Sequence, residues 1–256
     1  MKLAASGLAK SFAGGVEALA DVSIELAEGE FVSIVGPSGC GKSTLLAMLA
    51  GLLEPTAGRI LLDGREPPGG LLGRIGYMPQ RDLLMEWRTT LQNATLGLEL
   101  AGVGRAAARD RALAEVGRFG LAGFEDRRPS ALSGGMRQRA ALLRTFLAGR
   151  DVLALDEPFG ALDALTREAM REWLLGVWEA DRKTILLVTH DVEEAVFLSD
   201  RVYVMTGRPG RIRAAVDVAL PRPRALEVTS TAAFAALKDQ LLAPLREQAR
   251  AGLGVQ

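Results

Sequence analysis

Residues 32–44 read Val32-Ser33-Ile34-Val35-Gly36-Pro37-Ser38-Gly39-Cys40-Gly41-Lys42-Ser43-Thr44, and this stretch decides the fold. The part from Gly36 to Thr44 fits the pattern G-x-x-x-x-G-K-[ST], in which a strand leads through a glycine-rich loop into a helix. Glycines let the backbone turn tightly enough to aim N–H groups at phosphate oxygens, and the helix adds its positive dipole end. The stretch therefore predicts a site for the phosphates of ATP.

Three side chains of this loop have separate predicted roles. Lys42 brings a positive charge to the β- and γ-phosphates, and the Ser43 hydroxyl is placed to ligate Mg²⁺. Cys40 is the only cysteine of the chain. Considered alone it is a redox candidate, but inside this loop it is interpreted as a small filler whose backbone does the binding.

The composition limits the classes of partner. Lys and Arg number 31, and so do Asp and Glu, so the formal net charge is zero and the basic excess typical of nucleic-acid binding is missing. The clusters Arg208–Arg213 and Arg222–Arg224 are interpreted as solvated edges. A single cysteine predicts no disulfide framework, and neither a signal peptide nor an uncharged apolar run of about 18 residues is found. A soluble cytoplasmic protein, without nucleic acid as a partner, is expected.

Predicted strands and helices alternate along most of the chain. β-branched or alternating residues predict strands, and apolar residues at helical spacing predict helices. The predicted strands are Lys2–Lys10, Val22–Leu26, Phe31–Val35, Arg59–Leu62, Arg74–Met78, Val152–Leu155, Thr184–Val188 and Arg201–Met205. The predicted helices are Lys42–Gly51, Gly135–Ala148, Leu165–Ala180, Val192–Leu198 and Ala232–Ala251. This order indicates an α/β fold with a mostly parallel sheet that is covered on both faces.

One segment interrupts the alternation. From Asp82 to Arg128 the chain is rich in Ala, Leu, Arg and Glu and contains no convincing strand. It is interpreted as a helical insertion, at about 82–130, within a single domain that spans 1–256. A short C-terminal extension, at about 207–256, completes the expected organisation.

Two adjacent carboxylates follow the apolar strand Val152–Leu155. Successive side chains of an extended chain point to opposite sides, so Asp156 and Glu157 need not share one task. Asp156 suits the Mg²⁺ shell, directly or through a water, and Glu157 is placed to polarise the attacking water as a general base. The alternative, an acidic pair that caps the next helix, is less consistent with four uninterrupted apolar residues before it.

Two further polar residues end predicted strands. His190 is the only histidine of the chain and follows the apolar strand Thr184–Val188, and Gln80 follows Arg74–Met78. Ligands of open α/β sheets bind at the carboxyl ends of the strands. His190 is therefore a candidate for contact with the γ-phosphate, and Gln80 for contact with Mg²⁺ or the attacking water.

The motif Leu132-Ser133-Gly134-Gly135-Met136 starts a predicted helix. Ser133 is a good N-cap, and Gly134 and Gly135 leave backbone N–H groups exposed, which makes a second anion site. Alone it is compatible with a simple helix cap. One helix ahead of Asp156, however, it closely resembles the signature motif of ATP-binding-cassette (ABC) ATPases.

The resemblance to ABC ATPases covers nearly the whole chain, in one aromatic residue followed by six ordered motifs. It implies a P-loop NTPase core with a mostly parallel sheet, an N-terminal antiparallel β subdomain and an inserted α-helical subdomain. The residues that match the family are Phe12 (stacking on adenine), Gly36–Thr44 (Walker A), Gln80 (Q-loop), Leu132–Met136 (signature), Val152–Glu157 (Walker B), Ala161-Leu162-Asp163 (D-loop) and His190 (switch histidine).

The family also implies a mechanism. Two such domains form a head-to-tail homodimer in which each ATP lies between the Walker A loop of one copy and Ser133–Gly135 of the other. ATP closes the dimer and hydrolysis reopens it. The motion passes to two membrane permease subunits docked near Gln80 and the helical insertion, with Arg81–Arg88 lining the docking groove. A peripheral location at the cytoplasmic face of the inner membrane, and an indirect partnership with a solute-binding protein, are expected.

Finer features resemble the importer branch for nitrate, sulfonate and taurine, which includes importers of pyrimidine-type thiamine precursors. They are Leu84–Thr89, Glu193–Val202 and Met205–Ile212. Met136 is frequent in this branch, whereas Glu86 stands where a proline is usual. Trp87 is open to two interpretations, a core aromatic or a contact to a partner.

Two other classes of protein are weighed against an importer subunit. A soluble ABC ATPase that acts on DNA or ribosomes typically carries a coiled-coil insertion or two linked cassettes, and this chain has neither. A P-loop kinase has no need for Leu132–Met136. The transported solute is not encoded here, because the ATPase does not touch it.

Overall fold

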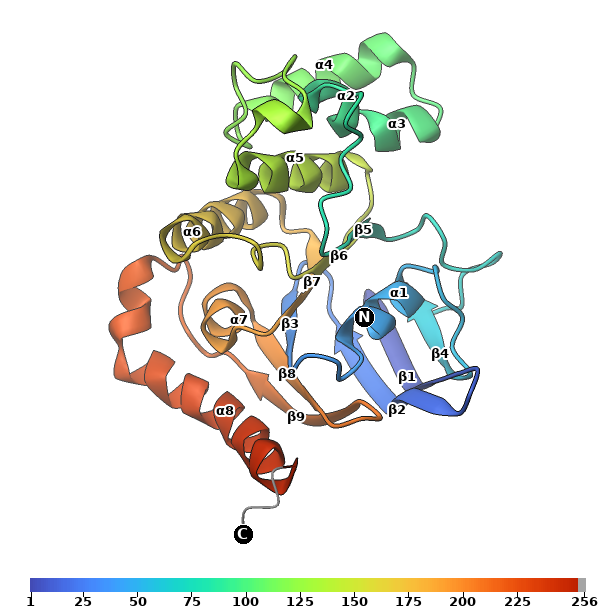
Figure 1. The fold of residues 1–256 in the computed structure, drawn as a ribbon, viewed down its shortest axis with the longest axis vertical. Coiled ribbons are helices and arrows are strands. Elements are labelled where there is room, and N and C mark those ends of the chain that lie inside the picture. Colours follow the sequence, from blue (N-terminus) through green and yellow to red (C-terminus); the bar gives the residue numbers. More distant parts are fainter. Residues whose placement is uncertain (253–256) are drawn as a thin grey trace.

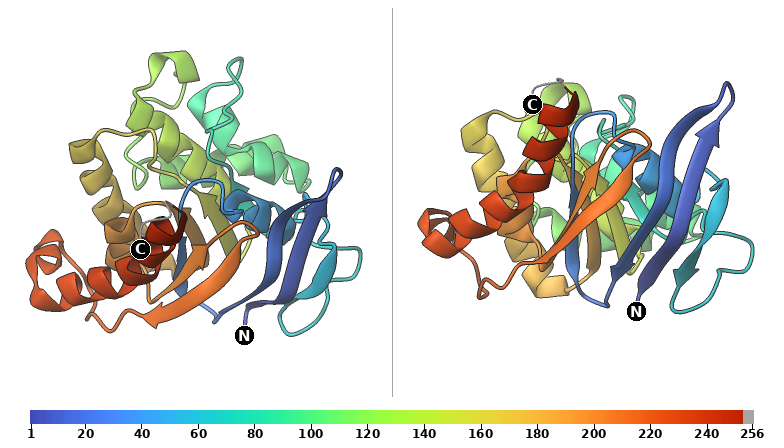
Figure 2. Two further views of the ribbon diagram at one scale, coloured as in Figure 1. Left: turned by 60° about the horizontal axis from the view of Figure 1, so that its bottom comes forward. Right: turned by 90° about the horizontal axis from the view of Figure 1, so that it is seen from below.

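The strands form two separate sheets in the computed structural model, which describes residues 1–252 (Figure 1). The smaller sheet has the order β2-β1-β4, and all its pairs are antiparallel. Its strands are β1 (Leu3–Phe12), β2 (Val16–Leu26) and β4 (Ala57–Leu62). Figure 2 shows this sheet standing beside the larger one, as the predicted N-terminal antiparallel subdomain requires.

The larger sheet has the order β5-β6-β7-β3-β8-β9. Its strands are β5 (Gly76–Met78), β6 (Val152–Asp156), β7 (Thr184–Thr189), β3 (Phe31–Val35), β8 (Arg201–Thr206) and β9 (Arg211–Asp217). All neighbours are parallel except β8 and β9. Strands β3, β6 and β7 are buried along their whole length, which explains their uninterrupted apolar sequences. The prediction of a mostly parallel, doubly covered sheet is confirmed.

Alternating residues of β3 contribute to two hydrophobic cores, because successive side chains point to opposite faces of a sheet. Phe31 and Val35 lie in a core shared with α6 (Ala164–Asp181), where Phe31 packs edge-on against Trp178 at 5.6 Å between ring centroids. Val32 and Ile34 lie in a core shared with α1 (Lys42–Leu49) and the smaller sheet. The strand that leads into the phosphate loop is thus packed on both sides.

The segment 82–128 contains helices and no strand, as its composition predicts. Its helices α2 (Thr90–Ala94), α3 (Leu96–Leu100) and α4 (Arg105–Val116) pack on α5 (Gly134–Leu147), which follows a short 3-10 helix at Pro129–Ala131. Together they form one end of the molecule, at the top of Figure 1.

The chain ends on helices that cover the other end of the larger sheet. Helix α7 (Val192–Leu198) lies beside β3, and a 3-10 helix at Leu226–Ser230 leads into α8 (Ala232–Gly252), which packs on β8 and β9. The final residues of the predicted C-terminal extension, 253–256, lie outside the described residues. Within residues 1–252, none of the helices combines the length and the apolar character needed to cross a membrane.

Three sequence predictions of local structure are wrong or incomplete. Strand β2 begins at Val16, before the predicted Val22, and β9 at Arg211–Asp217 was not predicted. Most residues of β9 are half-buried or exposed in alternation, so the strand lacks an apolar run. The interpretation of Arg222–Arg224 as a solvated edge is also wrong.

The two arginines of Arg222–Arg224 are held inside the fold. Arg224 is only 7% exposed, and its guanidinium donates to the carbonyl oxygens of Val196, Phe197 and Ser199. The guanidinium of Arg222 lies 4.2 Å from the ring centroid of Trp178. Both side chains anchor the segment after β9 to α7 and α6, because carbonyl oxygens and an aromatic face replace the water that a guanidinium needs.

Candidate active site

The phosphate loop joins β3 to α1 and encloses the side chain of Lys42. This lysine is 5% exposed, and its ammonium donates to the carbonyl oxygens of Gly36 at 2.7 Å and Pro37 at 3.0 Å. Gly41 caps α1 with φ of 102°, and a Cβ atom there would lie 2.6 Å from Leu19 Cδ2. The positive φ and the close contact both require glycine at this position.

Cys40 lies inside the protein, where its side chain is part of the core beneath the loop. Burial raises the pKa of its thiol, while the nearby Lys42 acts in the opposite direction. A buried thiol in an apolar setting is poorly reactive. The burial of Cys40 agrees with the filler interpretation and gives no support to the redox alternative.

The two acids after β6 occupy different environments, as their alternation predicts. Asp156 is 3% exposed, and burial raises the pKa of its carboxyl group, while the hydroxyl of Ser43 and the charge of Lys42 act in the opposite direction. Glu157 has a φ of 45°, which is rare for a residue with a side chain, and its N–H donates to the carbonyl of Val188 at 2.8 Å. Such backbone strain is concentrated at functional sites, since the surrounding structure must hold it.

Both polar residues that were predicted at strand ends, His190 and Gln80, contact the carboxylate of Glu157. His190 Nδ1 lies 3.1 Å from Oε2 of Glu157, and Gln80 Nε2 donates to the same oxygen at 3.2 Å. β5, β6 and β7 are adjacent and parallel, so the residues that follow them emerge at one edge of the sheet. These contacts leave the second ring nitrogen of His190 and the amide oxygen of Gln80 available to a ligand.

A cleft runs from this carboxylate along the phosphate loop to the first hairpin. Phe12, at the end of β1, is 42% exposed and offers a ring face there, with Lys10 Nζ at 5.5 Å from its centroid. The residues lining the cleft are Phe12, Val16, Ala18, Ser38, Gly39, Gly41, Lys42, Ser43, Thr44, Gln80, Glu157 and Arg208. The cleft thus combines an aromatic platform, a phosphate-binding loop and a candidate general base.

Two predicted ligand groups lie away from this cleft. Ser133 Oγ accepts a hydrogen bond from Met136 N at 3.3 Å and so caps α5, as predicted. Asp163 caps α6 by accepting from Thr166 N at 3.0 Å, and hydrogen bonding from the side chain and then the backbone of Thr166 lowers the pKa of its carboxyl group. Ser133, Gly134 and Asp163 are exposed, and Gly135 is half-buried. Among the described residues that line the cleft, none belongs to either motif.

Sequence reasoning missed three residues that line the cleft, Val16, Ala18 and Arg208, of which Arg208 is the charged one. Arg208 was grouped with a solvated edge, and it is exposed, but it also lines the cleft and donates to the carbonyl of Gly39. The signal in the sequence was the position of residues 207–210 just after the predicted strand Arg201–Met205. In the structure β8 pairs in parallel with β3, so this turn leaves the sheet at the edge of the phosphate loop.

The groups around the cleft supply positioned charge and hydrogen bonds rather than a side chain set up as a covalent nucleophile. This is the requirement of phosphoryl transfer to water, in which catalysis is almost entirely positioning and electrostatic stabilisation. The fold and the cleft together define a P-loop nucleoside triphosphatase.

Comparison with known proteins identifies the family. The family model described as "ABC transporter" matches residues 19–160. An uncharacterized ABC transporter ATP-binding protein of Methanocaldococcus jannaschii is 47% identical over 227 residues, which are 88% of this chain and 85% of that protein. The taurine import ATP-binding protein TauB of Yersinia pestis is 47% identical over 198 residues, 77% of each chain. This chain belongs to the ABC transporter ATP-binding family and is an ATP-hydrolysing subunit of such a transporter.

Solved structures agree with this fold. A dimeric ATP-binding cassette in a post-hydrolysis state with ADP and Pi superposes with a TM-score of 0.73 at 30% identity, covering 86% of this chain and 100% of that one. CbiO1 of Clostridium perfringens, part of the ABC transporter complex CbiONQ, has a TM-score of 0.77 at 25% identity and covers 95% and 96% of the two chains. The predicted fold class and ATPase activity are both confirmed.

Proposed function

We propose that this chain energises an importer of a small anion or organic solute, in the range of nitrate, sulfonates, taurine and pyrimidine-type thiamine precursors. The observation that carries the proposal is the identity of 47% with a taurine import ATP-binding protein, together with an intact set of hydrolytic residues at Glu157, His190 and Gln80. The chain would lie at the cytoplasmic face of the inner membrane, held by two permease subunits and served indirectly by a solute-binding protein.

The active unit in this proposal is a head-to-tail homodimer. The exposed N-terminus of α5, with Ser133 and Gly134, is built to bind an anion but lies outside the cleft of its own chain. A second copy resolves this, because its phosphate loop would bring ATP to these N–H groups. Asp163, exposed at the start of α6, would face the same interface.

The predicted site residues in and beside the cleft each have a role in this proposal. The ring of Phe12 stacks on adenine, the backbone N–H groups of Gly36–Thr44 and the Lys42 ammonium bind the phosphates, and Glu157 takes the proton of the attacking water. His190 and Gln80 hold the carboxylate of Glu157 by its Oε2 atom and so orient the other oxygen. The ammonium of Lys42 would exchange the carbonyl oxygens of Gly36 and Pro37 for phosphate oxygens.

The residues beside the phosphate loop also fit Mg²⁺, which prefers oxygen ligands. The buried carboxyl group of Asp156 lies near the Ser43 hydroxyl, which acts to lower the pKa of that carboxyl group, and Gln80 keeps its amide oxygen free. These are the residues that would hold the ion, directly or through water. When bound, Mg²⁺ neutralises charge that develops on the phosphate oxygens.

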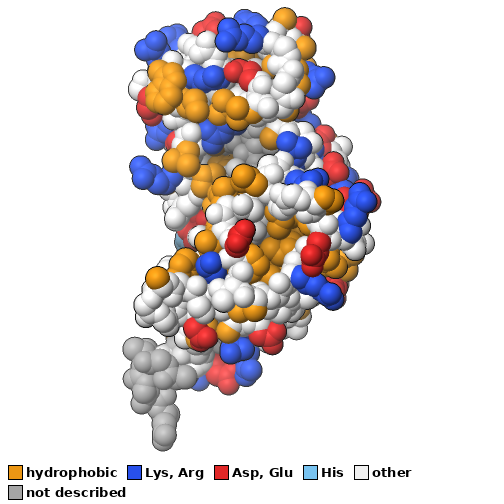
Figure 3. Space-filling model, turned by 90° about the vertical axis from the view of Figure 1, so that its right-hand side faces the viewer, with side chains coloured by type: hydrophobic (Ala, Val, Ile, Leu, Met, Phe, Trp, Pro, Cys, Tyr) orange, Lys and Arg blue, Asp and Glu red, His pale blue; other side chains and the backbone are white. Residues whose placement is uncertain are grey.

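The helical subdomain, at about 82–130, offers a docking surface for the permease. Trp87 is 72% exposed, so it is not the core aromatic that the sequence also allowed. It borders a groove whose other lining residues are Arg88, Leu91, Gln92, Thr95, Glu99, Arg105 and Arg109. Figure 3 shows one face of the molecule, on which hydrophobic side chains and several Lys or Arg side chains gather at this helical end. An exposed aromatic beside arginines is the composition of an interface hot spot.

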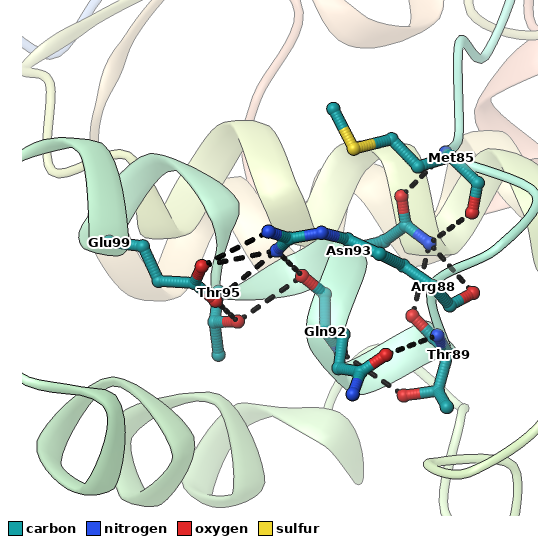
Figure 4. A network of polar contacts seen from close by, with 7 residues as sticks. All are labelled: Met85, Arg88, Thr89, Gln92, Asn93, Thr95 and Glu99. Atoms are coloured by element: carbon teal, nitrogen blue, oxygen red, sulfur yellow. Dashed lines mark hydrogen bonds and ion pairs between the residues drawn. The ribbon is translucent and has the colours of Figure 1, made fainter.

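The segment that carries Trp87 is held to α2 by hydrogen bonds (Figure 4). The side-chain amide of Asn93 donates to the carbonyl oxygens of Met85, Arg88 and Thr89 and accepts from Met85 N at 2.8 Å. The guanidinium of Arg88 forms a bidentate contact with Glu99, from Nη1 to Oε1 and from Nη2 to Oε2. These hydrogen bonds hold the backbone around Trp87 to α2, so in this proposal a force applied at Trp87 would pass to the helical subdomain.

The same segment is connected to the signature helix α5. Arg144 donates to the carbonyl oxygens of Asp82 and Leu83 at 2.6 and 2.7 Å, and Arg137 lies 3.4 Å from the carboxylate of Asp82. Asp82 follows Gln80 by two positions. This proposal therefore links three sites mechanically. They are the docking surface at Trp87, the amide oxygen of Gln80 and the anion site at Ser133.

Reconstitution tests the importer proposal. The chain would be co-purified with the permease encoded beside its gene, placed in vesicles and supplied with the neighbouring solute-binding protein. ATP-dependent uptake of labelled taurine, nitrate or an aminopyrimidine, lost in Glu157→Gln, is the expected result. ATP hydrolysis stimulated by DNA or ribosomes, with no stable complex with a permease, would contradict the proposal in favour of a soluble ABC ATPase.

A further inference from the structure

The turn between β8 and β9 brings a second cation to the nucleotide cleft. The guanidinium of Arg208 donates to the carbonyl oxygen of Gly39 through Nη2 at 3.1 Å and through Nε at 3.3 Å. A Cβ atom at Gly39 would lie 3.1 Å from the same Nη2. Arg208 thus lies directly against the phosphate loop, although 169 positions separate the two residues.

The position of Arg208 is fixed by the glycine two residues later. Gly210 N donates to Ala18 O at 2.8 Å, and Ala20 N donates to Gly210 O at 3.0 Å, so the turn is paired with β2. A Cβ atom at Gly210 would collide with the carbonyl oxygen of Cys40. The turn is therefore packed against both β2 and the phosphate loop, and it carries Arg208 at the mouth of the cleft.

Charge and donor capacity make Arg208 available to a ligand. The cations that line the cleft, within residues 1–252, are Lys42 and Arg208. None of the ion pairs among those residues involves Arg208, and its side chain is exposed. A guanidinium has five N–H donors in a planar fork, and the contacts to Gly39 occupy only its Nε and Nη2 side. Its Nη1 group remains free for phosphate, whose geometry a guanidinium matches well.

We infer that Arg208 is a further nucleotide-binding residue, which contacts the phosphate chain of ATP or ADP from the outer side of the phosphate loop. The inference rests on the proposal that Gly36–Thr44 holds those phosphates. Lys42 neutralises the charge of the phosphates from within the phosphate loop, and Arg208 does so from the β8–β9 turn. The same guanidinium also holds the loop at Gly39 through its hydrogen bonds to the carbonyl oxygen.

The test compares Arg208→Gln, Arg208→Lys and the control Arg211→Gln, an exposed arginine of the same hairpin. Dissociation constants for ATP and ADP are measured by calorimetry on the purified chain at low and high salt. Arg208→Gln is expected to weaken both nucleotides about tenfold, as for a hydrogen bond to a charged group. It should also reduce the salt dependence of binding, because one phosphate contact is lost. Arg208→Lys should keep that salt dependence, and Arg211→Gln should behave as the wild type.

A purely structural role for Arg208 gives a different result. If Arg208→Gln left the salt dependence of ATP and ADP binding unchanged, the contact with phosphate would be refuted, whatever the change in affinity. The variant Lys42→Ala separates this inference from the proposed site itself. Undiminished ATP binding by Lys42→Ala would overturn the site, whereas loss in Lys42→Ala with no effect of Arg208→Gln would overturn only the role of Arg208.

Discussion

His190 Nδ1 lies 3.1 Å from Oε2 of Glu157, and the same oxygen accepts from Gln80. A carboxylate held at one oxygen by two side chains presents its other oxygen in a fixed direction. General-base catalysis depends on such orientation, because the proton must be taken from a water already aligned with the phosphate. In the proposed mechanism, the contact therefore connects the strand ends of β5, β6 and β7 to one chemical step.

Replacement of Glu157 by glutamine tests this role. Glu157→Gln keeps the shape of the side chain and removes the base, so ATP turnover should fall at least about 100-fold. ATP should still bind and should trap a dimer, which size-exclusion chromatography with Mg-ATP detects. Glu168→Gln, on the outer part of α6, is the matched control and should hydrolyse ATP normally. Wild-type turnover in Glu157→Gln would show that another group is the base.

Mixing two inactive variants tests the shared site. Lys42→Ala removes the phosphate ligand of one copy, and Ser133→Arg blocks the anion site on the other. In the heterodimer both defects fall on one composite site, and the second site is intact. Turnover should therefore reappear on mixing, in a coupled assay of phosphate release, while each variant alone stays inactive. If mixing restores nothing, either the site is not shared or both sites must act together.

The buried acid Glu194 predicts a pH dependence of stability. Burial raises the pKa of Glu194 from 4.5 to about 8, because the charge of Arg171, whose Nε lies 4.0 Å away, does not offset the lost hydration. The Nη2 group of Arg171 forms an ion pair with Asp191 instead. The folded state therefore keeps a proton that the unfolded state releases above pH 4.5, and the free energy of unfolding falls as pH rises towards 8.

Urea unfolding at several pH values between 5 and 8 checks this prediction. Glu194→Gln carries no titrating proton, so the part of the decline in the free energy of unfolding that Glu194 causes should disappear. That part is more than about 1 kcal/mol, since a shift of one pKa unit corresponds to about 1.4 kcal/mol. Glu193→Gln, with a side chain that is 41% exposed, is the control and should retain the decline. Equal pH profiles for wild type and Glu194→Gln would mean that Glu194 is ionised in the folded protein.

Removal of Trp87 tests the docking surface. Trp87→Ala should change the free energy of unfolding by less than about 0.5 kcal/mol, because the side chain is 72% exposed. It should weaken binding of the chain to permease-containing vesicles by about tenfold or more, as the loss of an aromatic hot spot does. Leu52→Ala, at an exposed leucine in the turn after α1, should leave both quantities unchanged. Normal vesicle binding by Trp87→Ala would exclude this groove as the docking site.

Apolar patterning predicted the central strands well and the edges poorly. β3, β6 and β7 are buried on both faces and therefore read as unbroken apolar runs. β9 lies at the sheet edge with exposed arginines, so its sequence carries no such run. The interpretation of Arg224 as solvent-exposed fails for a related reason. A cluster of charged residues in the sequence does not reveal whether carbonyl oxygens of the fold will surround them.

The sequence alone determined the phosphate loop, the acids Asp156 and Glu157, and the cap at Ser133, because each is a local arrangement of backbone N–H groups and neighbouring side chains within a few residues. Only the tertiary structure decided that Gln80 and His190 meet at one oxygen of Glu157 and that Arg208 lies against Gly39. These distances depend on the strand order β5-β6-β7-β3-β8, which is set by the packing of both cores and is not written in any short segment.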